Sequence, residues 1–167
     1  MVDQRYLDVL RELVTRLQDA RLDSGASLLW ALTGSLSFAI QGVPVDPHDI
    51  DLQTDEAGAY AIERYFITDV IRSVRFSTAD RIRSHFGALC IDGIEVEIMG
   101  DVEKRLPDGS WEGPVEVEQH RRFVMADGLC VPVLSLSYEL DAYRKLGRLE
   151  RAAALEQWLA AQPSDEG

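Results

Sequence analysis

Residues 28–54 read LLWALTGSLSFAIQGVPVDPHDIDLQT, and this stretch decides the fold that we predict for the chain. It holds Gly34-Ser35 and, after thirteen further residues, the acid pair Asp49 and Asp51. Alternate residues of a strand point to the same face, so the two carboxylates would lie about 6–7 Å apart on one face. Such a pair is tolerated when it is solvated or when it holds a cation. On these residues alone, a metal site and a polar strand face are equally good interpretations.

The segments on either side of the acid pair show strand and helix patterns in turn. Residues 28–32 are continuously apolar, as in a buried strand, and residues 36–41 read as a helix that Gly42 ends. A strand that passes through a Gly-Ser turn into a helix offers free N–H groups and a hydroxyl, which suit a phosphate. Because most Gly-Ser pairs are plain turns, this signal depends on the acids that follow. Residues 48–53 are predicted to form the next strand.

A β-hairpin at residues 81–98 offers a third carboxylate. Asp92-Gly93 is a strong two-residue turn signal between two alternating runs. Beyond the turn, Glu95 and Glu97 share one face while the apolar residues between them share the other. We expect this strand to end at Gly100-Asp101.

The other segments complete a mixed pattern of helices and strands. We predict helices at residues 4–20, 55–66, 135–146 and 148–161, followed by a frayed tail at 162–167. Strand patterns occur at 115–125 and at 129–131, where Pro132 is expected to end pairing, and residues 71–76 fit a strand or a helix end equally well.

Length, composition and charge restrict the class of protein. A chain of 167 residues with 46% hydrophobic and 28% charged residues is expected to form a single domain, residues 1–167. The net charge of −12 disfavours broad, non-specific nucleic-acid binding. No apolar run is long enough for a membrane span or a signal peptide, so a cytoplasmic location is expected. Cys90 and Cys130 are expected to be buried free thiols.

The order of these motifs resembles the DNA polymerase β-like nucleotidyltransferase superfamily. The matching residues are Gly34-Ser35, Asp49-Ile50-Asp51 and Val96-Glu97-Ile98. The chain is most similar to the small stand-alone bacterial members, of the minimal and antibiotic nucleotidyltransferase type, over about residues 28–160. The resemblance implies an α+β nucleotidyltransferase fold, with a mixed sheet of about five strands and a C-terminal helix pair. It divides the chain into an N-terminal helix (1–22), a catalytic core (28–131) and closing helices (135–161).

The resemblance also implies a function. A nucleoside monophosphate would pass from an NTP such as ATP to an acceptor hydroxyl, on a small molecule, a protein side chain or an RNA end. Asp49, Asp51 and Glu97 would be the catalytic residues that hold two Mg²⁺ ions, while Gly34 and Ser35 would bind the β- and γ-phosphates. Glu95 shares the face of Glu97 and is an alternative third ligand, but Glu97 fits the family pattern better.

One departure from the family pattern leaves a second function open. The residues that follow Ser35 include no basic side chain, so the cation for the triphosphate must come from elsewhere. Lys145 is our first candidate, with Arg144 and Arg83 behind it, and His85 is predicted to line the nucleotide site. The missing cation favours the alternative of a catalytically inactive module that binds a nucleotide or a partner protein. A homodimer or a toxin–antitoxin partner is compatible with either function.

Overall fold

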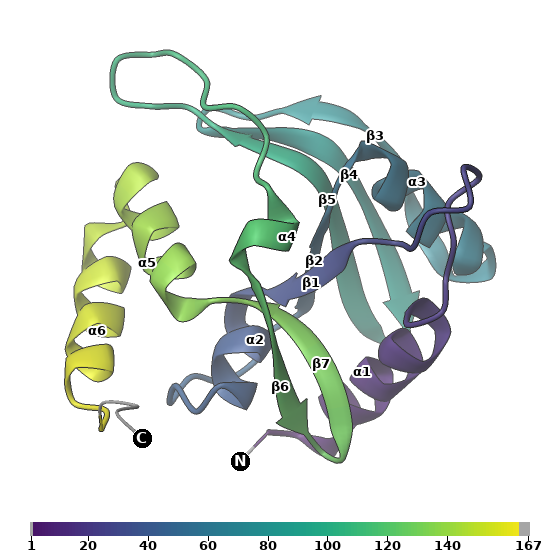
Figure 1. The fold of residues 1–167 in the computed structure, drawn as a ribbon, viewed down its shortest axis with the longest axis horizontal. Coiled ribbons are helices and arrows are strands. Elements are labelled where there is room, and N and C mark those ends of the chain that lie inside the picture. The colour runs from purple at the N-terminus through teal and green to yellow at the C-terminus, as the bar shows by residue number, and fades with distance from the viewer. Residues whose placement is uncertain (1, 164–167) are drawn as a thin grey trace.

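The computed structural model describes residues 2–163 (Figure 1). The last residues of the expected tail, 164–167, lie outside this range. None of the described helices has the length and apolar character to cross a membrane. The helices are α1 (Gln4–Leu17), α2 (Gly34–Ile40), α3 (Glu56–Tyr65), a 3₁₀ turn (Ile67–Asp69), α4 (Val117–His120), α5 (Leu136–Lys145) and α6 (Leu149–Ala160). The strands are β1 (Trp30–Thr33), β2 (Ile50–Thr54), β3 (Val70–Thr78), β4 (Ile82–Ile91), β5 (Ile94–Lys104), β6 (Arg121–Ala126) and β7 (Leu129–Leu134).

The strands form one mixed sheet in the order β3-β4-β5-β2-β1-β7-β6. Strand β2 pairs parallel to β5 and β1 pairs parallel to β7, whereas the other neighbours are antiparallel. The predicted α+β class and mixed sheet are confirmed, but the sheet has seven strands instead of about five. The sequence patterns at 71–76 and 115–125 overlap the two edge strands β3 and β6, so the expected count of about five is too low although both segments fit a strand. Strand β3 buries only Val74, and a strand with so little burial is hard to tell from a helix end by its pattern.

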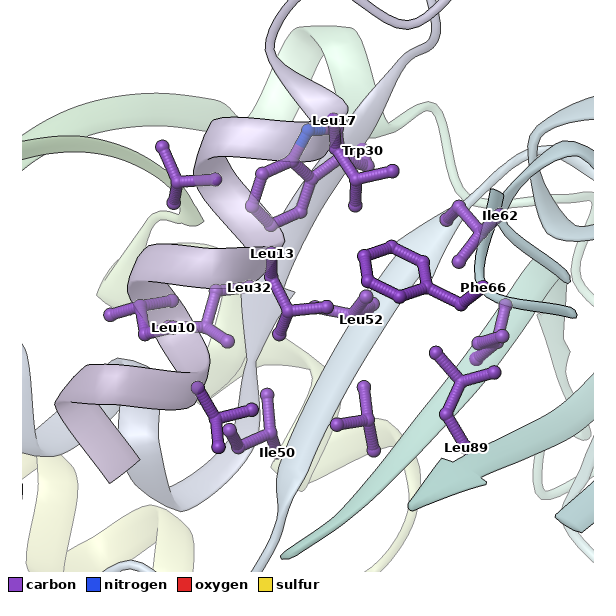
Figure 2. Packing of buried hydrophobic residues seen from close by; sticks show 14 of the residues in the cluster. Leu10, Leu13, Leu17, Trp30, Leu32, Ile50, Leu52, Ile62, Phe66 and Leu89 are labelled. Carbon is purple, nitrogen blue, oxygen red and sulfur yellow. The ribbon is translucent and has the colours of Figure 1, made fainter. Parts of the chain in front are cut away.

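One face of the sheet carries the main hydrophobic core (Figure 2). The apolar stripe of α1, with Leu10, Leu13 and Leu17, packs against Ile50 and Leu52 of β2. Helix α3 adds further apolar side chains to the same cluster. Each fully buried side chain of this size contributes about 1.5–3 kcal/mol. Because alternate residues of β2 belong to this core, its remaining residues must face the other side of the sheet.

That other side carries α2 and the predicted C-terminal helix pair. Helices α5 and α6 stand side by side on the left of Figure 1, far from α1 and α3. They join α2 through a second apolar cluster that contains Phe38, Leu136 and Leu155. Ser135 caps α5 by accepting a hydrogen bond from the Tyr138 N–H at 3.2 Å. The closing helices are therefore packed against the helix that follows the Gly-Ser turn.

Several predicted boundaries are wrong. Strand β5 does not end at Gly100-Asp101 but continues to Lys104, because a bulge places an extra residue opposite β4 and Asp101 adopts a φ of 51°. Pro132 does not end pairing either, since it lies opposite Phe123 in the β6–β7 ladder. Part of the segment 115–125 is helix α4 instead of strand. Both cysteines are free, as expected, but neither is buried, since Cys90 is half-buried and Cys130 is exposed.

Candidate active site

The structure brings the three predicted acids together. Asp51 of β2 lies directly opposite Glu97 of β5 in the parallel ladder. Asp49 immediately precedes β2, which begins at Ile50 instead of His48 as predicted. One carboxylate oxygen from each of Asp49, Asp51 and Glu97 lies within 4.8 Å of the others. Of the two candidate glutamates, Glu97 joins the cluster, whereas Glu95 is exposed and lies outside it.

Burial and mutual repulsion shape the charge of this cluster. Burial, together with the nearby negative charge of Asp49, raises the pKa of Asp51 to about 8. Burial also raises the pKa of Glu97, which shares a hydrogen bond with Asp51. Three half-buried carboxylates at such short range need a compensating positive charge when they ionise. Oxygen ligands in this number and spacing are those that Mg²⁺ prefers.

The Gly-Ser turn lies against the acids. Gly34 has a φ of +76°, and a Cβ atom at this position would lie 2.3 Å from Asp51 Oδ2. The Ser35 Oγ accepts a hydrogen bond from the His48 N–H at 3.1 Å, which ties the turn to the start of β2. Because this bond uses a lone pair of Ser35 Oγ, the hydroxyl proton can be donated to a ligand.

A cavity of about 790 Å³ opens over these residues. It is lined by the acids and Gly34-Ser35 together with further side chains of α2, α5 and α6. The apolar or aromatic members of this helical lining include Phe38, Tyr143, Leu155 and Trp158. The volume falls in the range of ligand pockets, which combine apolar walls with a few polar groups.

The predicted cations do not line this cavity. Lys145 pairs with Glu112 at 2.8 Å and with Asp141 at 3.1 Å, and it is absent from the cavity wall. The alternatives are also paired elsewhere, Arg144 with Glu156 and Arg83 with Glu103. The basic residues that line the cavity are Lys104, Arg148 and Arg151.

Sequence reasoning missed these three basic residues for identifiable reasons. The predicted end of the third strand at Gly100 excluded Lys104, which lies at the end of the longer β5. The sequence signal for a shared role of Arg148 and Arg151 was their spacing, because residues three apart at the start of a helix share one face.

His85 lies on the opposite face of the sheet from the acids. Its ring nitrogen Nδ1 is 3.1 Å from the Tyr60 hydroxyl of α3, and Nε2 is 3.8 Å from Glu56. Together with Glu56 and Asp101, it forms a second group of side chains with metal-ligand character. The prediction that His85 lines the nucleotide site is wrong in its placement, because alternation on β4 turns this side chain toward α3.

A buried polar network also lines the cavity, and sequence reasoning missed it. The Thr33 hydroxyl donates a hydrogen bond to Glu139 of α5, and Lys104 Nζ donates one to the Tyr138 hydroxyl at 2.8 Å. Burial raises the pKa of Glu139 to about 7 and lowers that of Lys104. The sequence signal was the position of Glu139 in the first turn of α5, next to the apolar residue Leu140, whereas the other acid of this helix, Asp141, is exposed.

Comparisons with known proteins agree on the class of this fold. A family model for aminoglycoside-2''-adenylyltransferases matches residues 10–157. A protein from Thermotoga maritima of known crystal structure, described provisionally as a nucleotidyltransferase, is 54% identical to this chain. The match covers 97% of both chains, with a TM-score of 0.81.

The crystal structure of the lincosamide antibiotic adenylyltransferase LnuA with lincomycin bound is 13% identical, with a TM-score of 0.49. That match covers 83% of this chain and 84% of LnuA, and at this score it carries no argument. No curated protein matches the chain.

The fold, the acidic site, the family model and the match to the Thermotoga maritima protein define a nucleotidyltransferase. The chain belongs to the aminoglycoside-2''-adenylyltransferase family, whose model spans most of its length.

Proposed function

We propose that this protein transfers a nucleoside monophosphate from an NTP to an acceptor hydroxyl, in the manner of the DNA polymerase β-like superfamily. The observation that carries the proposal is the meeting of Asp49, Asp51 and Glu97 beside Gly34-Ser35 in one cavity. The family name favours ATP as the donor and hence adenylate as the transferred group.

The three acids fit a divalent cation. They provide only oxygen ligands, they lie within 4.8 Å of one another, and burial makes their ionisation unfavourable without a positive charge. Asp49, Asp51 and Glu97 would therefore hold the Mg²⁺ ions. When bound, Mg²⁺ supplies charge stabilisation for the attacking and the leaving oxygens of an in-line displacement.

Other residues of the cavity would bind and orient the NTP. Ser35 has a free hydroxyl proton to donate to a phosphate oxygen, and Gly34 lets the backbone approach the acids closely. Arg148 and Arg151 bring two positive charges from α6 to the same cavity. They would take the place of the basic residue that the superfamily usually carries after Ser35, since arginine side chains bind phosphate groups well.

The acceptor class follows from charge and from the family name. An aminoglycoside is a polycation, and a protein with a net charge of −12 attracts polycations over a long range. The same charge repels an RNA end. We therefore favour a small cationic molecule with a hydroxyl group as the acceptor.

The alternative function, a catalytically inactive binding module, was favoured by the absence of a basic residue after Ser35. Arg148 and Arg151 supply positive charge to the cavity and therefore weaken the case for this alternative. A homodimer, a toxin–antitoxin partner, the single-domain division and a cytoplasmic location stay predictions.

A titration with ATP tests the proposal. Wild-type protein and Asp51→Asn are compared by thermal unfolding with and without Mg²⁺. We expect ATP to raise the Tm of the wild type only in the presence of Mg²⁺, and we expect Asp51→Asn to lose this rise. Release of pyrophosphate in the presence of a pool of aminoglycosides measures turnover. Equal ATP stabilisation of both proteins, or of either without Mg²⁺, would contradict a metal-dependent site.

A further inference from the structure

Gln53 is an unpartnered polar side chain in the floor of the cavity. It lies on β2 two residues after Asp51, on the same face of the sheet, and is only 8% exposed. Among residues 2–163, its Oε1 atom is buried without any hydrogen-bond partner. Leaving such an atom unpaired costs about 1–3 kcal/mol, and native structures rarely do so without a reason. Because Gln53 lines the cavity, a bound ligand can supply the missing donor.

The side chains that flank Gln53 on the two neighbouring strands are apolar, whereas Asp51 precedes it on the same face and Glu139 and Lys104 line the same cavity. The flanking residues are Ala31 on β1 and Met99 on β5, whose side chains offer no hydrogen-bond donor. Further along β5, Lys104 lines the same cavity with an ammonium group that donates a hydrogen bond to the Tyr138 hydroxyl. The cavity therefore offers apolar side chains, one amide and one ammonium donor in addition to its carboxylates.

The order of side chains along β2 indicates where Gln53 lies relative to the expected phosphate positions. Ser35 is tied to His48 just before the strand, Asp51 lies within it, and Gln53 follows about 7 Å further on. A triphosphate beside Ser35 and an α-phosphate beside Asp51 thus leave Gln53 on the side away from the pyrophosphate.

The chemistry of Gln53 and Lys104 suits a nucleobase better than two other possible occupants. The carbonyl oxygen of an amide is an acceptor, so Gln53 Oε1 repels a phosphate. The ammonium of Lys104 is a donor and cannot accept a hydrogen bond from the ammonium groups of a polycationic acceptor. A nucleobase, by contrast, has apolar faces and an edge that carries both donors and acceptors.

We propose that Gln53 and Lys104 form the subsite that binds the nucleobase of the NTP. The Oε1 atom of Gln53 accepts a hydrogen bond from an N–H of the base, and Lys104 Nζ donates one to a ring nitrogen or carbonyl oxygen. The inference rests on the proposed function, since it assigns one part of the same cavity to the donor nucleotide.

A comparison of two ligands and three proteins tests the subsite. Binding of ATP and of inorganic tripolyphosphate, each with Mg²⁺, is measured calorimetrically for wild type, Gln53→Met and Gln41→Met. Gln41 is the matched control, because its Oε1 is also buried and unpartnered while the residue lies outside the cavity wall. We expect Gln53→Met to weaken ATP binding about tenfold, as for one lost hydrogen bond, and to leave tripolyphosphate binding unchanged. Gln41→Met should leave the binding of both ligands unchanged.

Thermal unfolding of the ligand-free proteins separates this role from a structural one. Methionine has a similar shape but no unpaired polar atom, so Gln53→Met should unfold at the same temperature as wild type or higher. Unchanged ATP affinity in Gln53→Met, or an equal loss for ATP and tripolyphosphate, would overturn the subsite while leaving the proposed function intact. If wild type binds neither ligand with Mg²⁺, the proposed function fails and the subsite fails with it.

Discussion

Gly34 and Asp51 lie so close that no side chain fits between them. A Cβ atom on Gly34 would be 2.3 Å from Asp51 Oδ2, well inside van der Waals contact. The glycine also has a φ of +76°, in the left-handed region. The turn that enters α2 and the central carboxylate of the acidic cluster are thus one packed unit, in which a change to either residue displaces the other.

We therefore expect Gly34→Ala to abolish the Mg²⁺-dependent stabilisation by ATP. Gly128→Ala is the matched control, because Gly128 has the same φ of +76° and nothing within 4 Å of its Cβ position. Both variants should lose about 1–2 kcal/mol from backbone strain, which corresponds to roughly 2–8 °C in Tm. Only Gly34→Ala should also lose ATP binding, as measured by calorimetry. Normal binding by Gly34→Ala would show that the position of Asp51 is not critical.

We expect Glu97, and not Glu95, to be the third metal ligand. Both lie on β5, but only Glu97 has an oxygen within 4.8 Å of the Asp49 and Asp51 oxygens. Since loss of an outer-shell partner already weakens metal binding about 10–100-fold, Glu97→Gln should lower Mg²⁺-dependent ATP binding by at least about 100-fold. Glu95→Gln should change it less than about twofold, because an exposed carboxylate outside the cluster interacts weakly. The reverse pattern would move the third ligand to Glu95.

The third prediction concerns the cations that meet the triphosphate. Arg148 and Arg151 line the cavity, whereas Lys145 is paired with Glu112 and Asp141 outside it. The double variant Arg148→Gln/Arg151→Gln should bind tripolyphosphate with Mg²⁺ about tenfold more weakly, and the loss should shrink at high salt because both side chains are exposed. Lys145→Gln should bind as wild type does. A larger loss in Lys145→Gln would restore the lysine as the triphosphate contact.

We expect Glu139 to make the free energy of unfolding depend on pH. Burial raises its pKa in the folded protein to about 7, from about 4.5 when it is solvated. The fold therefore favours the protonated acid, and this contribution is complete below about pH 4.5 and is lost as the pH rises through about 7. Glu139→Gln keeps an acceptor for the Thr33 hydroxyl without the titration.

Denaturant unfolding between pH 4.5 and pH 8 checks this expectation. The free energy of unfolding of wild type should fall, relative to Glu139→Gln, by on the order of 1–3 kcal/mol across that range. If the free energy of unfolding changes with pH equally in both proteins, folding does not alter the pKa of Glu139.

The sequence was most informative where the pattern is local. Each of α3 and α5 begins at one of the two cap candidates that its sequence offers, Asp55 instead of Thr54 and Ser135 instead of Ser137, because capping depends on residues only a few positions apart. The hairpin around Asp92-Gly93 was equally clear, since a tight turn sets the pairing of its own strands. The edge strand β3 was harder to predict, because it buries only Val74 and an exposed strand shows little apolar alternation.

By itself the sequence determined that Gly34-Ser35, Asp49-Ile50-Asp51 and Glu97 belong to strand and turn segments of a nucleotidyltransferase. Alternation along a strand follows from backbone geometry alone, so the shared face of Asp51 and Gln53 was already determined. Only the tertiary structure decided that Glu97 lies opposite Asp51, that His85 faces α3, and that Arg148 and Arg151 replace Lys145 at the cavity. These relations depend on how segments distant in the chain pack, and packing is set by long-range contacts that no local pattern contains.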